Sequence, residues 1–343
     1  MDHARASHFS RRGLLAAGGA LGLGALLAAC GDSDSKKGSD KGADKAGPWS
    51  FKDDRGQTAS TKSTPKNIVA FIGTAAALHD YGIGVKGVFG PTKLQDGKPD
   101  VQAGDLDISK VEILGNVWGE FNVEKYAALV PDVLITNTWE KDALWYVPDE
   151  SKDKILKLAP SVAIAVGGDV SLTKPLERTA ELAKSLGADL NAKAVVDAKT
   201  RFEKAAASVR EAAKSNPGIK VLAGSAAADL FYVSTPKTSA DLRYFEELGV
   251  TFVVPTKLDA GGFFESLSWE NADKYKADLI MLDNRTSQLQ PEALKAKPTW
   301  AQLPAVKAGQ ITPRVTEPIF SYAKCAPILE ELAEAIKKAK KVS

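Results

Sequence analysis

Few side chains of this chain are suited to acid–base, metal or redox chemistry. The sequence has three histidines and two cysteines, and His3, His8 and Cys30 all lie ahead of residue 31. Beyond them only His79 and Cys325 remain. One imidazole cannot form a zinc or manganese site of several histidines, and we expect His79 to sit on a helix face. Cys325 lies in an apolar-periodic stretch and is expected to be a buried core thiol.

Cys30 has the sequence context of a lipid-acceptor cysteine. The pair Arg11-Arg12 precedes an Ala/Gly/Leu run that ends in Leu27-Ala28-Ala29-Cys30. A basic head, a short apolar body and small residues before a cysteine are typical of a lipoprotein signal peptide, here of twin-arginine type. The alternative, a transmembrane anchor, is disfavoured because the run is shorter than the roughly 20 residues of a bilayer span. We expect residues 1–29 to be a signal peptide and Cys30 to be lipidated on the outer face of the cell membrane.

Composition limits the remaining possibilities. The formal net charge is +2 over 343 residues, so no nucleic-acid partner is expected. Residues 30–48 are polar and rich in Gly and Ser, which predicts a flexible tether. A length of 343 residues suits about two domains. With one cysteine left beyond Cys30, no disulfide forms within the mature monomer.

Aromatic and guanidinium side chains gather in the segments that follow short apolar runs. The aromatic candidates for a pocket are Trp118, Trp139, Trp145, Tyr146, Tyr232, Phe263, Phe264, Phe320 and Tyr322. The guanidinium candidates are Arg243, Arg285 and Arg314. An apolar pocket with a few fixed polar groups suits a small organic ligand, and it lies beyond the carboxyl ends of strands in an α/β fold. Arg285 has an alternative role as a structural partner of Asp283 or Glu317.

The elements that must position these side chains alternate between apolar runs and helical stretches. After a predicted hairpin at 49–61, the apolar runs of the first half are 67–72, 85–89, 111–114, 133–136 and 162–166. Those of the second half are 220–223, 231–233, 252–254 and 279–282. Helical stretches separate several of them, including a short helix predicted over 268–275, and a terminal helix is predicted over 322–341. Such alternation predicts βαβ units and a largely parallel sheet.

One long helix is predicted between the two halves. From Val195 to Ala212 apolar residues recur at spacings of three and four, which makes one stripe on a helix of roughly 35 Å. The sequence therefore predicts an α/β fold of two Rossmann-like lobes, with parallel-rich sheets flanked by helices. The lobes are expected at 49–190 and 217–343, and one long rigid helix at 191–216 joins them.

Two local motifs repeat the same design, one in each lobe. The first runs from Asn122-Val123-Glu124 through two helical turns to Val130-Pro131-Asp132 and an apolar strand. The second runs from Ser268-Trp269-Glu270 to Asp278 and a strand, without the proline. With the lobe order, they resemble the bacterial solute-binding proteins in which a single helix joins the lobes. Those proteins serve ABC importers of ferric siderophores, haem and cobalamin, and the resemblance covers essentially the whole mature chain.

The resemblance implies roles for individual residues. In that family the two helix-start glutamates pair with arginines of the permease, and Glu124 and Glu270 stand at the matching positions. The alternative role for both glutamates is that of solvated carboxylates that cap the helix start. The segments 264–270, 282–285 and 303–310 are similar to siderophore-binding lipoproteins of Gram-positive bacteria. A monomer without a cofactor is expected, with iron held by the siderophore and no metal ligand from the protein.

The charge of the loops favours one ligand class. A ferric tris-catecholate carries a large negative charge and needs a cluster of Arg and Lys, whereas the first-lobe loops offer mainly Lys93 and Lys141 beside Glu120, Glu140 and Asp142. A ferric tris-hydroxamate such as ferrioxamine, neutral at its metal centre, suits aromatic walls with one or two guanidinium donors.

The chain departs from one feature of the hydroxamate binders and leaves other ligands open. Trp118 stands where those binders place an arginine. The alternatives are a cobalamin or haem importer lipoprotein and, in another class, an extracytoplasmic hydrolase or a structural surface lipoprotein. The haem alternative is weakened because the chain offers few His and Met side chains to ligate the haem iron. The hydrolase alternative is weakened because the chain has no Gly-x-Ser-x-Gly turn.

Overall fold

The structure is a computed structural model that describes residues 47–140 and 142–343. The predicted signal peptide, Cys30 and most of the predicted tether lie outside these residues. The described chain begins with an antiparallel hairpin of β1 (Trp49–Lys52) and β2 (Thr58–Thr61), which confirms the predicted hairpin. Asp53 fixes its turn, because its carboxylate accepts hydrogen bonds of 3.0 Å from the backbone N–H groups of Arg55 and Gln57.

The first lobe is built on five parallel strands in the order β5-β4-β3-β6-β7. These strands are β3 (Ile68–Phe71), β4 (Gly87–Phe89), β5 (Glu112–Ile113), β6 (Val133–Thr138) and β7 (Ser161–Ala165). The helices around them are α1 (Ile72–Asp80), α2 (Val123–Ala128), α3 (Asp149–Leu158) and α4 (Thr173–Ser185), with 3-10 turns at Val101–Ala103 and Ile108–Lys110. Every residue of β6 is buried, as expected for a central parallel strand covered on both faces.

The second lobe has a mixed sheet in the order β11-β9-β8-β12-β13, and β10 pairs with the start of β8. Its strands are β8 (Lys220–Ala226), β9 (Leu230–Ser234), β10 (Thr251–Phe252), β11 (Phe264–Ser268), β12 (Leu279–Asp283) and β13 (Ile311–Arg314). Its shorter helices are α6 (Ala240–Glu247), α7 (Pro291–Leu294), α8 (Pro298–Gln302) and α9 (Pro304–Lys307). Strands β8, β12 and β13 run parallel, whereas β9 and β11 are antiparallel to their neighbours.

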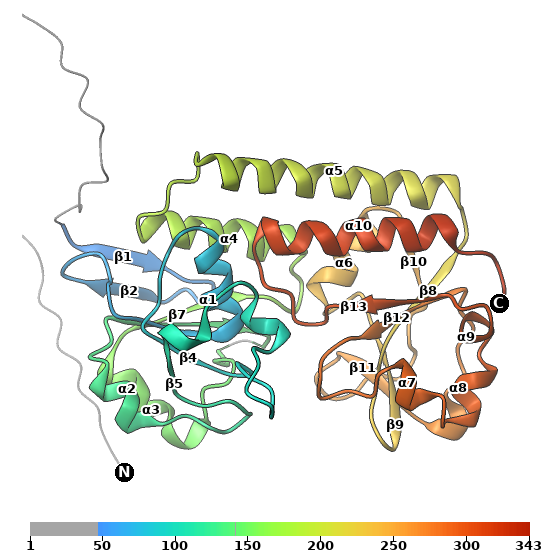
Figure 1. Ribbon diagram of the computed structural model, residues 1–343, viewed down its shortest axis with the longest axis horizontal. Coiled ribbons are helices and arrows are strands. Elements are labelled where there is room, and N and C mark those ends of the chain that lie inside the picture. Colours follow the sequence, from blue (N-terminus) through green and yellow to red (C-terminus); the bar gives the residue numbers. More distant parts are fainter. Residues whose placement is uncertain (1–46, 141) are drawn as a thin grey trace, which may run out of the picture. The chain divides into compact units, whose positions relative to one another are not determined.

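The long helix α5 (Lys193–Ser215) lies alongside the terminal helix α10 (Tyr322–Lys338), and Figure 1 shows the two side by side. The predicted stripe faces the core, where Phe202, Ala205, Val209 and Ala212 are buried. Two α/β lobes joined by one long helix are thus the fold of the described residues, and the predicted fold class is confirmed. No helix in residues 47–140 and 142–343 combines the length and apolar character needed to cross a bilayer.

The two repeated motifs each tie a strand to its neighbour through an aspartate. Asp132, just before β6, accepts hydrogen bonds of 2.8 Å from the backbone N–H groups of Lys66 and Asn67, ahead of β3. Asp278, just before β12, accepts one of 2.9 Å from the N–H of Lys220 at the start of β8. Both carboxylates therefore hold two adjacent parallel strands in register at their amino ends.

The second motif departs from the predicted helix over 268–275. Only a 3-10 turn forms there, at Trp269–Asn271. Tertiary contacts explain the difference. The Trp269 indole N–H donates to backbone carbonyls of the turn after β8, and the Tyr275 hydroxyl donates to the buried Glu265 carboxylate at 2.6 Å. These hydrogen bonds tie Trp269 and Tyr275 to other parts of the lobe, and the segment does not continue as an α-helix beyond Asn271.

Candidate ligand-binding site

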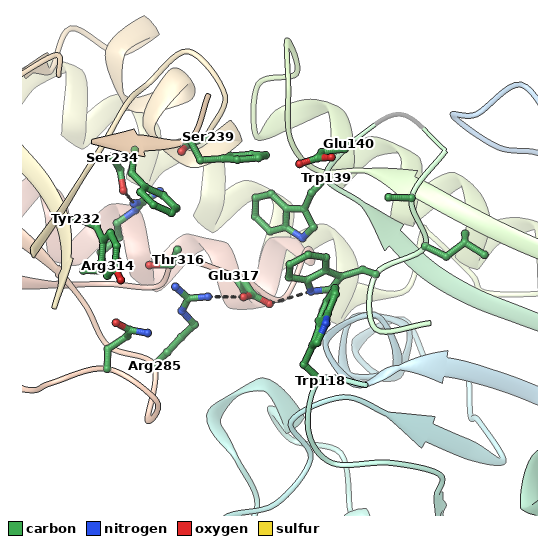
Figure 2. A pocket seen from close by; sticks show the side chains of 17 residues that line it. Trp118, Trp139, Glu140, Tyr232, Ser234, Ser239, Arg285, Arg314, Thr316 and Glu317 are labelled. Carbon is green, nitrogen blue, oxygen red and sulfur yellow. Dashed lines mark hydrogen bonds and ion pairs between the residues drawn. The ribbon is translucent and has the colours of Figure 1, made fainter. Parts of the chain in front are cut away.

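A cavity of about 620 Å³ lies between the lobes, where strands of both sheets end. All described residues belong to one compact unit. Trp139 and Glu140 follow β6 directly, Arg285 comes two residues after β12, and Arg314 is the last residue of β13. Figure 2 shows their side chains around a common space. This is the edge at which open α/β sheets bind ligands.

Aromatic rings form the first-lobe wall of the cavity. The ring centroids of Trp118 and Trp145 are 4.9 Å apart in an edge-on arrangement, and those of Trp139 and Trp145 are 5.7 Å apart. Phe263 of the second lobe reaches to 6.4 Å from Trp139. Trp118 is 63% exposed although its indole is large and apolar. An exposed apolar surface of this kind beside a cavity marks a place where a ligand can be covered.

The second-lobe wall combines two aromatic rings with a fixed guanidinium. Tyr232 and Phe264 meet edge-on with centroids 4.9 Å apart. Arg314 is buried, and its Nε and Nη2 donate to the two oxygens of Asp241 at 2.9 and 3.0 Å. Its Nη1 donates to the Ser234 hydroxyl at 2.8 Å. Arg314 is thus positioned by a bidentate pair, which compensates the cost of its burial.

Arg285 links the floor of the cavity to both lobes through Glu317. Its Nη1 donates to Glu317 at 2.6 Å, and its Nη2 donates to the fully buried Asp283 at 2.6 Å. The other Glu317 oxygen accepts hydrogen bonds of 3.2 Å from Trp145 and Gln102 of the first lobe. Figure 2 marks the bonds of Arg285 and Trp145 to this carboxylate. The sequence offered Asp283 and Glu317 as alternative partners of Arg285, and the guanidinium contacts both.

The ion pairs shift the pKa values of this network in a consistent direction. Burial alone would raise the pKa of Asp283, but the hydrogen bonds and charge of Arg285 outweigh it and hold the pKa below its usual value. Burial alone would lower the pKa of Arg285, and its bonds to Asp283 and Glu317 raise it instead. Both groups are therefore charged across the physiological range.

Several polar atoms at the cavity are buried without a protein partner. They are the Trp139 indole nitrogen, the Gln288 Oε1 atom and the Thr316 hydroxyl oxygen. Buried polar groups normally find a hydrogen-bond partner. Their presence on the lining provides one donor, one acceptor and one hydroxyl that can serve as either for a bound molecule.

Two further cavities adjoin this one through shared side chains. One of about 880 Å³ shares Trp118, Arg285 and Glu317 with it, and another of about 430 Å³ shares Trp139, Glu140 and Phe263. A ligand larger than the central cavity therefore has space to extend along the cleft in two directions.

The structure brings most of the predicted pocket residues together. Those that line the central cavity are Trp118, Trp139, Trp145, Tyr232, Phe263, Phe264, Arg285 and Arg314. Tyr146 lies one step away: its ring packs against Trp118 at 5.0 Å and lines the adjoining cavity.

The three other predicted pocket residues line neither the central cavity nor the two cavities that adjoin it. Phe320 and Tyr322 are buried in the core around α5 and α10, where the Tyr322 ring contacts Phe202 at 5.4 Å. Arg243 turns away to the carbonyls of Gly168 and Lys237. Phe320 and Tyr322 both lie at the end of the segment that leads from β13 to α10, and they face the core because α10 starts there.

Other lining residues were not predicted as site residues. They are Glu140, Ala143, Leu144, Ser225, Ser234, Ser239, Gln288, Thr316 and Glu317. Glu140 and Glu317 lie close in sequence to predicted pocket residues, but the sequence does not indicate whether such a carboxylate points into the cavity or into solvent. Ser225 and Ser234 lie in strands, and only the register of β8 and β9 brings them to the cavity.

The two predicted docking glutamates are both exposed at element starts. Glu124 lies in the first turn of α2, whose N-cap Asn122 accepts a 2.9 Å hydrogen bond from the N–H of Lys125. Glu270 lies in the 3-10 turn Trp269–Asn271. Neither lines the central cavity.

Protein-based metal ligation finds little support in the described residues. In residues 47–140 and 142–343, no group of three or more His, Cys, Asp or Glu side chains could hold a metal ion. Cys325 is a fully buried free thiol, and burial raises its pKa, so little of it is thiolate.

Comparison with known proteins identifies the family to which this chain belongs. The chain belongs to the periplasmic binding protein family, which it matches over residues 70–312. It is similar to the crystal structure of DesE, a ferric-siderophore receptor protein from Streptomyces coelicolor. The two are 63% identical, with a TM-score of 0.83, over 86% of this chain and 100% of that one.

Two curated relatives from Bacillus subtilis (strain 168) are more distant. The iron(3+)-hydroxamate-binding protein FhuD is 24% identical over 297 residues, which are 85% of this chain and 87% of FhuD. The Fe(3+)-citrate-binding protein YfmC is 23% identical over 287 residues, or 83% of this chain and 84% of YfmC. The family is extracytoplasmic and its established role is binding.

Proposed function

We propose that this protein is an extracytoplasmic, lipid-anchored receptor for a ferric siderophore of the hydroxamate type, such as ferrioxamine. It holds the complex in the cavity between its lobes and delivers it to an ABC permease for iron uptake. The observation that carries the ligand class is the cavity itself, which has aromatic walls and two guanidinium groups that protein carboxylates already neutralise. Likeness to DesE and FhuD supports the assignment.

The state of the two arginines decides between ligand charges. A tris-catecholate complex would need cationic groups that no protein carboxylate neutralises. Arg285, however, pairs with Asp283 and Glu317, and Arg314 pairs with Asp241. A complex that is neutral at its iron centre requires only apolar contact and a few hydrogen bonds. Trp118, Trp139 and Trp145 supply the contact, and Arg285, which is partly exposed, keeps N–H groups for hydroxamate oxygens. Iron stays within the siderophore.

Delivery and anchoring rest on residues outside the cavity. Glu124 and Glu270 are exposed, one in each lobe, and suit ion pairs with arginines of permease subunits. Two contacts on separate lobes can report how the lobes are spaced. Cys30 provides the acyl anchor, and the protein acts as a monomer.

The test is a titration of tryptophan fluorescence. Three tryptophans line the cavity, so a bound complex should quench their emission strongly. Ferrioxamine, a ferric tris-catecholate, haemin and cobalamin are compared at equal concentrations. We expect the tightest binding for ferrioxamine. Equal or tighter catecholate binding would overturn the hydroxamate class, and binding of cobalamin or haemin alone would replace the siderophore by that ligand.

A further inference from the structure

Counted together with the carboxylates bonded to its arginines, the central cavity is surrounded by more negative than positive side chains. Glu140, Glu317, Arg285 and Arg314 line it, and Asp283 and Asp241 are bonded directly to the two arginines. Four carboxylates therefore oppose two guanidinium groups, which leaves two formal negative charges in excess. The adjoining cavity beside Trp118 adds Lys93 and Asp100, which cancel.

The excess has a specific location at the rim. Glu317 is held by three donors, whereas the side chain of Glu140 is engaged by no hydrogen bond or ion pair among the described residues. Figure 2 shows Glu140 beside the ring of Trp139, and the same carboxylate lines both the central and one adjoining cavity. Lys141, the next residue in the chain, lies outside the described residues.

The neighbouring groups also suit a cation. The rings of Trp139 and Phe263 line the same two cavities as Glu140, and the faces of aromatic rings attract ammonium groups. Glu140 and Glu317 would repel a polyanionic ligand. A neutral complex would have no cation to pair with the Glu140 carboxylate.

Building on the proposed function, we propose that the receptor selects ferric hydroxamate complexes that carry a protonated amine, and that Glu140 is the acceptor for that ammonium. The iron centre lies against the tryptophans and Arg285, and the amine-bearing end points to the rim. Glu140 acts here as a specificity-determining residue. The aromatic wall binds all ferric hydroxamate complexes in the same way. The negative charge of Glu140 at the rim determines which of them bind most tightly.

The experiment uses two ligands that differ only in this charge. Ferrioxamine B ends in a protonated amine, and its N-acetyl derivative ends in a neutral amide. Dissociation constants are measured by tryptophan quenching at low ionic strength for the wild type, Glu140→Gln and the control Glu150→Gln. Glu150 is an exposed carboxylate of α3 that lies outside the cavity, so its variant removes the same charge elsewhere.

We expect the wild type and Glu150→Gln to bind the amine form roughly five- to ten-fold tighter than the amide form. In Glu140→Gln the ratio of the two dissociation constants should fall to within about two-fold. Equal binding of both forms by the wild type would overturn the selection, and a ratio that persists in Glu140→Gln would overturn the assignment of Glu140. If the wild type binds neither form, the proposed function itself fails.

Discussion

Replacement of Arg285 by alanine should destabilise the fold as well as weaken binding. The guanidinium compensates the carboxylate of Asp283, which is 0% exposed, through bonds from Nε and Nη2 of 2.6 to 3.1 Å. Loss of one partner of a buried ion pair costs about 3–5 kcal/mol. We expect the lower end, about 3 kcal/mol, because the Arg285 side chain is 30% exposed and Asp283 keeps its 2.7 Å bond from Ser225.

Urea unfolding, followed by tryptophan fluorescence, measures this loss at neutral pH. The double variant Asp283→Asn with Arg285→Ala should be more stable than Arg285→Ala alone, because it removes the uncompensated charge. Arg201→Ala is the matched control. Its pair with Glu330 has side chains 54% and 42% exposed, so the cost should stay below about 1 kcal/mol. If Arg285→Ala unfolds at the wild-type urea concentration, Asp283 does not depend on this arginine and the reasoning is wrong.

The same network predicts a pH dependence with a defined sign. The folded-state pKa of Asp283 lies below its ordinary value of 3.8, so the ionised carboxylate stabilises the folded protein. This stabilisation is complete above 3.8 and is lost as the pH falls through the lowered folded-state value. The stability difference between the wild type and Arg285→Ala should therefore narrow in acid. A difference that is constant from neutral pH to below 3.8 would contradict the pairing.

Three further predictions concern anchoring, delivery and closure. Cys30→Ala should release the protein from membranes, since two acyl chains anchor stably where one does not, and fractionation after carbonate washing checks this. Glu124→Ala and Glu270→Ala should leave ligand affinity unchanged and impair cellular iron uptake; a large loss of affinity in the purified variants would place them in the site or the fold. Small-angle scattering with and without ligand should differ little, because α5 restricts the hinge, and a wide domain rotation would refute this.

The parallel strands and the long helix could be predicted because their signals are local. Buried parallel strands such as β6 carry continuous apolar runs, and the stripe of α5 repeats over its whole length. Two second-lobe strands were missed for physical reasons. Strand β13 contains Pro313, which is tolerated because β13 is at the edge of its sheet. Strand β11 turns the charged Glu265 inward, where Lys274 and Tyr275 satisfy it.

The sequence predicted the types of residue in the candidate site better than the partners to which those residues are bonded. Aromatic residues after strands indicated the walls, but nothing local indicates that Arg314 meets Asp241, 73 positions away. The direction of a side chain near an element boundary is equally hidden. Tyr322 begins α10 and packs on Phe202, so Phe320 and Tyr322 belong to the core and not to the predicted pocket. Such outcomes depend on tertiary packing, which sequence spacing does not encode.

The shared bonding of Glu317 has a kinetic consequence. One of its oxygens accepts hydrogen bonds from Gln102 and Trp145 of the first lobe, and the other contacts Arg285 of the second lobe, to which Glu317 itself belongs. Glu317 therefore bridges the two lobes at the floor of the cleft, and its bonds limit how far the lobes reorganise when a ligand is captured. Encounter, rather than a preceding domain motion, should limit association. In stopped-flow mixing, the observed rate should then rise in proportion to ligand concentration, in a single phase and without a plateau.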